Sequence, residues 1–157
     1  MDQPPRHPTT VSRKGPRELV VTRRFDHPAA AVFAAWTRAD LFRQWWAPKS
    51  MGAVIAACEI DARPGGGYRL TFGEGAEAMT FFGRYVEVTP PHRLVWTNEE
   101  GEDGPVTTVT FEDDGGRTLL VMSELYPGEV PQDAVAGMEA MAGEQFGQLD
   151  SLLAARA

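Results

Sequence analysis

Few side chains in this sequence are spaced as catalytic or metal-binding groups usually are. The three histidines, His7, His27 and His92, each lie next to a proline in a turn or tail. A zinc site needs three or four converging ligands, and no His-x-His, His-Glu-x-x-His or histidine–carboxylate spacing falls within one expected element. We therefore expect no metal and no cofactor, and we assign no catalytic residue.

Two further motifs fit structural roles better than chemical ones. Gly65-Gly66-Gly67 lacks the lysine and the following helix of a phosphate-binding loop, so the sequence favours a tight turn between strands. Cys58 is the only cysteine and lies in an expected strand with no assignable base. A buried, inert thiol is favoured over a nucleophile. A single cysteine cannot form an internal disulfide, which is typical of a reducing compartment, and we expect a cytoplasmic protein.

Aromatic and methionine side chains are the more informative set. Alternation along strands places Tyr68, Leu70 and Phe72 on one face, and the pairs Leu94/Trp96, Val109/Phe111 and Leu120/Met122 behave in the same way. Such a wall suits a small apolar ligand, but the same pattern also fits residues that only fill a core. The candidate pocket residues are Phe33, Trp36, Trp45, Phe72, Phe81, Trp96, Phe111, Met122, Met138, Met141 and Phe146.

Three polar residues are candidates for the same pocket: Tyr85, Glu124 and Glu144. Tyr85 follows Arg84 directly, so alternation allows only one of the two to point inward. Glu144 would be a general base if it were buried, or a solvated glutamate if it lay on the outer side of its helix. Trp45 and Trp46 diverge by roughly 100° on a helix, so one ring can pack inward while the other forms a pocket lip or a dimer contact.

The sequence predicts that these residues belong to one α+β domain. An expected strand at 19–25 is followed by a helix at 29–36 and a short amphipathic helix that Pro48 stops. Six short strands then follow between Ala53 and Glu124, with Asp113-Asp114-Gly115-Gly116 as the clearest hairpin signal. A final helix runs from Pro131 to about Ala155, with an apolar stripe at Val135, Met138, Ala142, Phe146, Leu149 and Leu153.

This order, β-α-α-β6-α, predicts a curved antiparallel sheet of about seven strands wrapped around the C-terminal helix. Residues 1–17 are basic and rich in proline, so we expect a disordered or loosely attached tail before a domain at 18–157. The 157-residue chain carries a net charge of −7, which argues against a nucleic-acid partner. No apolar run is long enough for membrane insertion.

Several local motifs occur together in this chain: Phe25–Pro28, Val32–Thr37, Leu41, Trp45–Pro48, Arg63–Gly66 with Tyr68, Pro90–Thr97 and Thr107–Glu112. They resemble segments of bacterial proteins related to the C-terminal domain of the activator of the Hsp90 ATPase, in the START-like helix-grip superfamily. The resemblance covers roughly residues 18–155, and Met138 stands where the final helix of such proteins often carries tryptophan.

The resemblance implies a helix-grip fold with an internal cavity, and leaves three functions open. The first is a protein that holds a small hydrophobic molecule without changing it. The second is a cofactor-independent cyclase or hydrolase that uses polar pocket residues. The third is a protein that contacts a chaperone through the Trp45–Trp46 edge or through the acidic loop at Glu99–Asp103.

Overall fold

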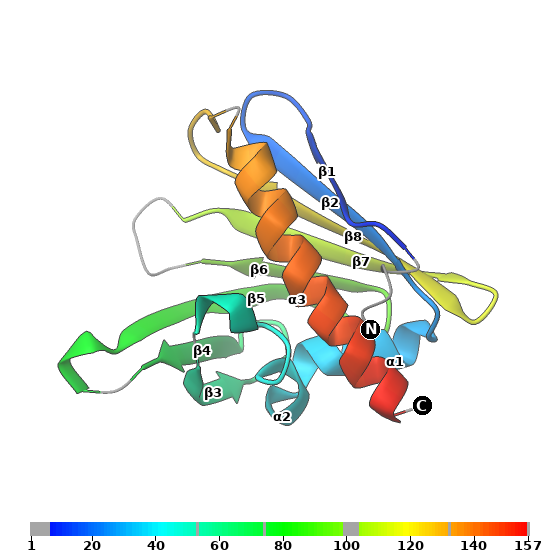
Figure 1. Ribbon diagram of the computed structural model, residues 1–157, viewed down its shortest axis with the longest axis horizontal. Coiled ribbons are helices and arrows are strands. Elements are labelled where there is room, and N and C mark those ends of the chain that lie inside the picture. Colours follow the sequence, from blue (N-terminus) through cyan, green and yellow to red (C-terminus); the bar gives the residue numbers. More distant parts are fainter. Residues whose placement is uncertain (1–6, 53, 74, 99–103, 132, 157) are drawn as a thin grey trace.

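The computed structural model describes residues 7–52, 54–73, 75–98, 104–131 and 133–156. One long helix crosses a face of an eight-stranded antiparallel sheet whose strand order is β1-β2-β8-β7-β6-β5-β4-β3 (Figure 1). The strands are β1 (Thr10–Arg13), β2 (Glu18–Phe25), β3 (Ile55–Ile60), β4 (Gly67–Phe72), β5 (Met79–Thr89), β6 (Arg93–Thr97), β7 (Val106–Asp114) and β8 (Arg117–Leu125). The helices are α1 (Ala29–Thr37), α2 (Ala39–Phe42) and α3 (Ala134–Arg156), with short 3-10 turns η1 (Lys49–Met51) and η2 (Gly75–Glu77).

The six consecutive strands and the long final helix confirm the predicted helix-grip architecture. The hairpin between β7 and β8 turns at Gly115 and Gly116, whose φ angles are 64° and 87°. Residues other than glycine rarely adopt such φ angles, which is why the Asp-Gly-Gly sequence marks this turn so clearly. The register then pairs Phe111 with Leu120 and Val109 with Met122, and these side chains are buried in the core.

The N-terminal segment contains a strand that the sequence analysis did not predict. Thr10–Arg13 form β1, which pairs antiparallel with β2 at the edge of the sheet. The backbone of Pro16 also accepts a hydrogen bond from the amide of Val130, at 2.8 Å. This part of the expected tail is therefore paired with the domain, whereas residues 1–6 lie outside the described residues. The four residues of β1 are too few to show the alternation of a strand unless the strand with which they pair is known.

The two short helices differ slightly from expectation. The first helix, α1, begins after Pro28, which caps it from an extended conformation, and it ends one residue later than expected, at Thr37. The regular part of α2 spans only Ala39–Phe42, and turn hydrogen bonds from Trp45 and Trp46 to the carbonyl of Phe42 continue the segment. Trp45 is fully buried and donates its indole N–H to Ala35 at 2.9 Å, whereas Trp46 is only partly buried.

A buried arginine joins the first long strand to the last helix. Arg23 is 2% exposed, and its guanidinium group lies 3.3 Å from the carboxylate of Asp150 on α3 and 4.8 Å from the ring centroid of Phe25. His27 lies 3.7 Å from the same carboxylate. Because a buried charge needs a partner, this pair helps to fix α3 against β2.

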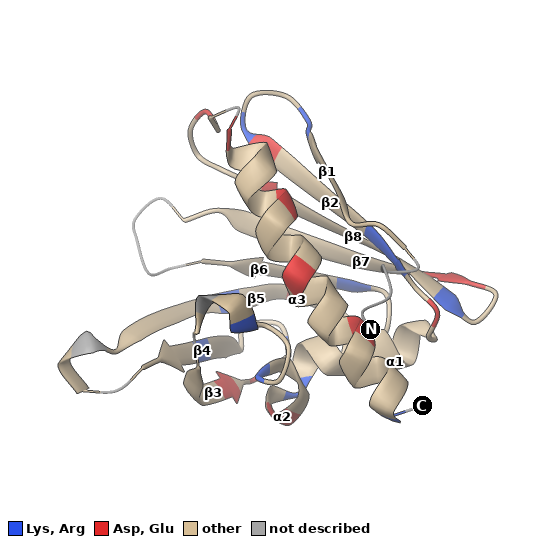
Figure 2. Ribbon diagram, in the orientation of Figure 1, with Lys and Arg blue, Asp and Glu red and all other residues tan. Residues whose placement is uncertain are grey.

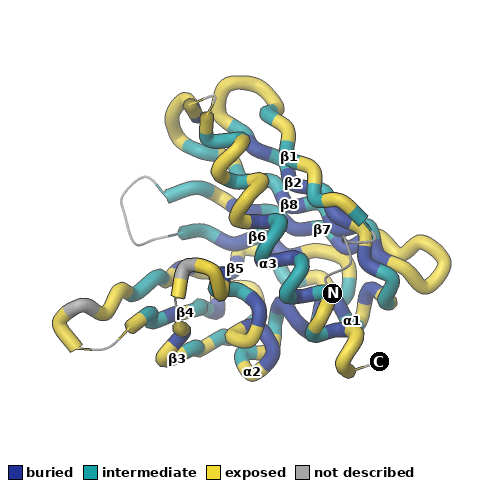
Figure 3. The backbone as a smooth tube through the Cα atoms, in the orientation of Figure 1, coloured by how far each residue is buried: buried dark blue, intermediate teal, exposed yellow. Residues whose placement is uncertain are grey.

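The core lies between the sheet, α1 and the inner side of α3. Trp36 and Trp45 pack with their ring centroids 4.8 Å apart, and Phe25 meets Phe146 edge-on at 6.0 Å. The buried residues of α3 all lie from Ala142 onward, whereas the N-terminal part of the helix is more exposed (Figure 3). Acidic residues recur along the same helix (Figure 2). No described helix combines the length and apolarity needed to cross a bilayer.

Candidate functional site

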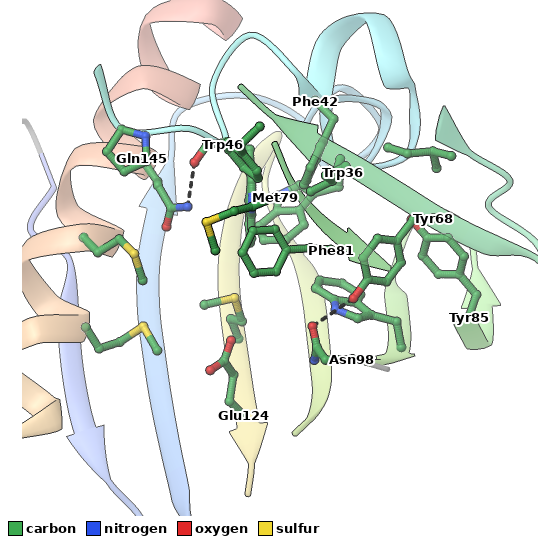
Figure 4. A pocket seen from close by; sticks show the side chains of 18 residues that line it. Trp36, Phe42, Trp46, Tyr68, Met79, Phe81, Tyr85, Asn98, Glu124 and Gln145 are labelled. Atoms are coloured by element: carbon green, nitrogen blue, oxygen red, sulfur yellow. Dashed lines mark hydrogen bonds between the residues drawn. The ribbon is translucent and has the colours of Figure 1, made fainter. Parts of the chain in front are cut away.

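A cavity of about 480 Å³ lies between the sheet and the N-terminal half of α3. Its walls come from the α1–α2 region, from strands β3 to β6 and β8, and from α3 (Figure 4). Most of the lining is apolar, with eight aromatic side chains from Trp36 to Trp96 among the described residues. The lining residues are Trp36, Phe42, Trp46, Pro48, Ile60, Tyr68, Leu70, Phe72, Met79, Phe81, Tyr85, Trp96, Asn98, Met122, Glu124, Met138, Met141 and Gln145.

The aromatic part of the cavity is built from rings that hold one another in place. Phe42 stacks on Trp46 with 4.8 Å between centroids, and Phe72 meets Phe81 edge-on at 5.5 Å. Met79 and Met141 also line the cavity and are 60% and 41% exposed. Since both contact solvent as well as the hollow, they mark where it opens to the outside. Flexible methionines at such an opening can adapt to ligands of different shape.

Polar groups gather at one end of the cavity. The Tyr68 hydroxyl donates to Asn98 Oδ1 at 2.8 Å, and Asn98 Nδ2 donates to the carbonyl of Pro105 at 2.8 Å (Figure 4). Asn98 also bonds Thr107, which is the direct cross-strand partner of Glu124. Glu124 and Asn98 therefore border the same end of the hollow, away from the Trp36–Phe42 end (Figure 4).

Glu124 is the only carboxylic acid among the described lining residues. It follows Met122 by two residues on β8, so both side chains point to the same face of the sheet. Its Oε2 accepts a hydrogen bond of 2.5 Å from the hydroxyl of Tyr126. Burial raises the pKa of Glu124, and the Tyr126 hydrogen bond opposes that shift only in part. The protonated, uncharged form is thus stabilised relative to a glutamate in water.

Tyr85 points inward, and Arg84 is exposed, as alternation requires. Burial raises the pKa of the Tyr85 hydroxyl, and the negative forms of Cys58 and Asp61 add to this shift. The hydroxyl therefore stays protonated at physiological pH. Tyr85 and Glu124 occupy separate parts of the wall (Figure 4).

The segment that carries Trp46 is tied to α3 by side-chain amides. Gln148 donates to the carbonyls of Trp45 and Ala47 at 2.8 and 2.9 Å and accepts from the amide of Lys49 at 2.9 Å. Gln145 donates to the carbonyl of Trp46 at 2.7 Å. These bonds satisfy backbone groups in a segment without regular structure, and they fix the position of one cavity wall.

Glu144 has a structural role in the same region. It accepts hydrogen bonds from the amide and hydroxyl of Ser50, the former at 2.8 Å. The hydroxyl and then the backbone bond lower the pKa of Glu144, so the carboxylate stays charged. Glu144 does not line the cavity, so it fits the solvated alternative of the sequence analysis and not a buried base.

The structure brings most of the candidate pocket residues to the cavity. Those that line it are Trp36, Phe72, Phe81, Trp96, Met122, Met138, Met141, Tyr85 and Glu124. Those that lie in the packed core instead are Phe33, Trp45, Phe111 and Phe146. These four side chains also point to the interior of the protein, but they lie nearer α1, where neighbouring side chains fill the space. Phe33 and Phe111, for example, meet edge-on at 5.3 Å.

Sequence reasoning did not select several of the lining residues. Tyr68 and Leu70 share a face with Phe72, so the alternation that selected Phe72 could also have selected them. Met79 pairs with Phe72 in the register of β4 and β5, which no local pattern reveals. The other unselected residues are Phe42, Pro48, Ile60 and Asn98, while Trp46 fits the pocket-lip alternative given for the Trp45–Trp46 pair.

A second hollow of about 610 Å³ opens beside α2 and β3. Its lining includes the exposed side chains of Asp40, Arg43 and Lys49, so it is a polar surface groove rather than an enclosed apolar site. Cys58 borders it, and burial raises the pKa of its thiol, while Arg43 opposes the shift. Within the described part of the chain, no three histidine, cysteine or acidic residues are placed to hold a metal ion.

Comparison with solved structures shows the same fold in several bacterial proteins. A crystal structure from Rhodobacter sphaeroides has a TM-score of 0.82 and 25% identity, over 94% of this chain and 98% of that one. A solution structure from Staphylococcus epidermidis has a TM-score of 0.79 and 24% identity, over 94% and 95% of the two chains. A solution structure of the AHSA1-like protein from Aeromonas hydrophila has a TM-score of 0.67 and 20% identity, over 84% and 92% of the two chains.

Comparison with curated proteins gives no match. A family model described as "Activator of Hsp90 ATPase homolog 1-like protein" matches residues 26–154, which span both short helices, β3 to β8 and most of α3. The matched region contains every residue that lines the cavity. The chain therefore belongs to the family of activator of Hsp90 ATPase homolog 1-like proteins.

Proposed function

We propose that this protein binds a small hydrophobic molecule in the cavity between its sheet and α3. The observation that carries the proposal is the cavity itself, a hollow of about 480 Å³ with a largely apolar lining. Ligand sites in proteins commonly measure about 300–1,000 Å³ and combine apolar walls with a few polar groups. A residue set chosen only to fill a core would pack without such a space.

The position of α3 supports the same function. Its C-terminal half is anchored by Phe146 and Leu149, both fully buried, so the helix keeps its place when the hollow is empty. A preformed cavity needs little reorganisation to accept a ligand, and this lowers the free-energy cost of binding. Trp36, Trp46 and Trp96 lie in the wall, so their fluorescence can report the binding of a ligand.

Binding of an uncharged apolar dye tests this function. We expect Nile red to bind the purified protein and to quench the fluorescence of the wall tryptophans. The variant Met138→Trp should weaken binding at least about tenfold, because a larger side chain then occupies the hollow. Ala140→Trp is the matched control, since Ala140 is exposed on the same helix and does not line the cavity.

Equal dye affinity in the wild type and Met138→Trp, or no dye binding at all, would contradict the proposal. Native mass spectrometry of protein from its own host gives an independent test. A small molecule that accompanies the wild type and is lost from Met138→Trp would identify the natural ligand directly.

A second candidate is an enzyme of the cyclase or hydrolase kind, and Glu124 is the observation that favours it. A carboxyl group in an apolar site, with its pKa raised by burial, can act as a general acid or base near neutral pH. This alternative requires turnover, for example of p-nitrophenyl esters of different chain length. It also requires that Glu124→Gln abolish turnover while leaving Nile red binding intact.

Chaperone contact remains a third expectation. The acidic loop at Glu99–Asp103 lies outside the described residues, and Trp46 is directed to the cavity wall. The two surfaces named for such a contact therefore add no support. A titration of bacterial Hsp90 with this protein, followed by ATP hydrolysis, tests the expectation, and an unchanged rate would remove it.

A further inference from the structure

We propose that the ligand of this cavity is uncharged and carries a hydrogen-bond donor, such as a hydroxyl or amide N–H group, that binds the carboxyl group of Glu124. This inference rests on the proposed binding function and names the chemical class of the ligand. It follows from which polar atoms of the wall are already engaged, from the charges near the hollow and from the separation of its polar and apolar ends.

Several polar groups of the wall have partners within the protein, whereas the indole N–H of Trp36 is buried without one among the described residues. Asn98 donates to Pro105 and Thr107 and accepts from Tyr68, while Gln145 donates to the carbonyl of Trp46. Tyr126 binds Oε2 of Glu124, whereas Oε1 has no hydrogen bond within the described residues. Oε1 therefore offers an acceptor to a ligand donor at this end of the cavity.

The charges around the hollow disfavour an anionic ligand. The described lining contains no lysine, arginine or histidine, and its one acid is Glu124. The helix that covers the cavity adds three acids, Glu139, Glu144 and Asp150, against one base, Arg156, in its last turn (Figure 2). A carboxylate or phosphate ligand would lose its hydration and find no counter-ion, and this costs several kcal/mol.

A cationic ligand is disfavoured for a different reason. An ammonium group would need Glu124 in its charged form, and burial disfavours that form by raising the pKa of the carboxyl group. A neutral donor is compatible with both protonation states. The carboxylate can accept its hydrogen bond, and the protonated group still has an acceptor oxygen.

The shape of the site fits a molecule with one polar end. Glu124 and Asn98 border one end of the hollow, whereas Trp36, Phe42 and Trp46 form the other (Figure 4). A ligand whose donor reaches Glu124 therefore directs its apolar body toward the aromatic rings. Long-chain alcohols, phenols and apolar amides have this chemistry, whereas ionised fatty acids do not.

Three probes of equal length test the inference: decanol, decanoic acid and decylamine, each competing with Nile red at pH 7. We expect decanol to bind wild-type protein at least about tenfold more tightly than decanoic acid. The hydroxyl of decanol donates a hydrogen bond to Glu124, whereas the carboxylate of decanoic acid has no proton to donate. Glu124→Leu should reduce this preference by weakening decanol binding, since the acceptor is lost. Glu124→Gln should retain the preference for decanol, because the amide oxygen still accepts the hydrogen bond of the ligand.

The ratio of two probe affinities within one variant does not depend on how stable that variant is. Glu112→Gln is the matched control, because it removes an exposed acid on β7 that does not line the cavity, and it should leave all ratios unchanged. Decanoic acid or decylamine binding as tightly as decanol in the wild type would overturn the inference but leave the binding function intact. If Nile red and all three probes fail to bind, the binding function fails first.

Discussion

The two halves of α3 contact the same sheet in different ways. Toward the C-terminus, Phe146, Leu149 and Leu153 are at most 4% exposed and pack on the aromatic cluster under α1. Toward the N-terminus, Met138 is partly buried and Met141 is 41% exposed, and the cavity separates them from β4 and β5. Figure 3 shows this change in burial along the helix.

The difference separates stability from binding within one element. The packed half holds α3 in place through side-chain contacts, the Arg23–Asp150 pair and the amides of Gln145 and Gln148. The other half is then free to leave a hollow without loss of the fold. Substitutions in the two halves should therefore have different consequences, and the following four comparisons are ordered by expected effect.

The largest contrast is between Phe146→Ala and Met141→Ala. Removing the fully buried ring should lower the free energy of unfolding by about 3–5 kcal/mol, because a cavity remains in a packed region. Met141→Ala removes a side chain that already contacts solvent and a hollow, so its cost should stay below about 1 kcal/mol. Urea titration followed by tryptophan fluorescence measures both. Equal losses would show that the two halves are packed alike.

Gln148→Ala sharpens the comparison by releasing the segment that carries Trp46. The variant loses three hydrogen bonds to the backbone of Trp45, Ala47 and Lys49, each worth about 0.5–1.5 kcal/mol, so we expect a loss of about 2 kcal/mol. Gln44→Ala is the control, since it removes one exposed bond to Asp40. Faster amide hydrogen exchange should appear around residues 45–50. Unchanged exchange there would mean that the amides do not hold the wall.

Glu124→Gln tests the polar end of the cavity through the dependence of stability on pH. The folded-state pKa of Glu124 is raised, so well below pH 4.5 the carboxyl is protonated in both states and costs nothing. As pH rises from the unfolded pKa toward the raised folded pKa, the unfolded chain ionises first, and this lowers the stability of the folded protein. The variant should thus gain about 1 kcal/mol over wild type at pH 7, the scale of one desolvated polar group, and little at pH 4. A gain that is the same at both pH values would exclude ionisation of Glu124 as its cause.

Gly143→Ala should give the smallest effect, a gain of about 0.5–1 kcal/mol. A Cβ atom at this helical position meets nothing within 4 Å, so only the helix propensity changes. Gly83→Ala is the opposite case, because its Cβ would lie 1.8 Å from the carbonyl oxygen of Thr97. Thermal unfolding should therefore shift upward for the first variant and sharply downward for the second. A loss of stability in Gly143→Ala would show that α3 needs close approach at that point.

The sequence predicted the elements with a strong local signal. Alternation in β7 and β8 identified the inward face from Val109 to Met122, and the stripe of α3 identified Phe146 and Leu149. The edge strand β1 was missed because four residues without a visible partner carry almost no periodic signal. Pairing across the sheet, as between Thr10 and Thr22, is not encoded in either segment alone.

The site was predictable to a smaller extent. Helical geometry indicates that Trp45 and Trp46 diverge, but it does not tell which ring faces the core. The structure buries Trp45 and places Trp46 in the cavity wall. In the same way, Glu124 and Glu144 carry identical side chains, and only the course of the chain around them makes one a cavity residue and the other a partner of Ser50. Burial and partners are tertiary properties, so local patterns could not decide either case.

The ion pair between Arg23 and Asp150 has a consequence for how the protein is made. It joins residues 127 positions apart, so this contact forms only after the segment that contains Asp150 has left the ribosome. Until then the nascent sheet has no helix over its apolar face. The hollow therefore forms only after α3 has been synthesised, and a ligand present at that moment can be enclosed as the helix docks.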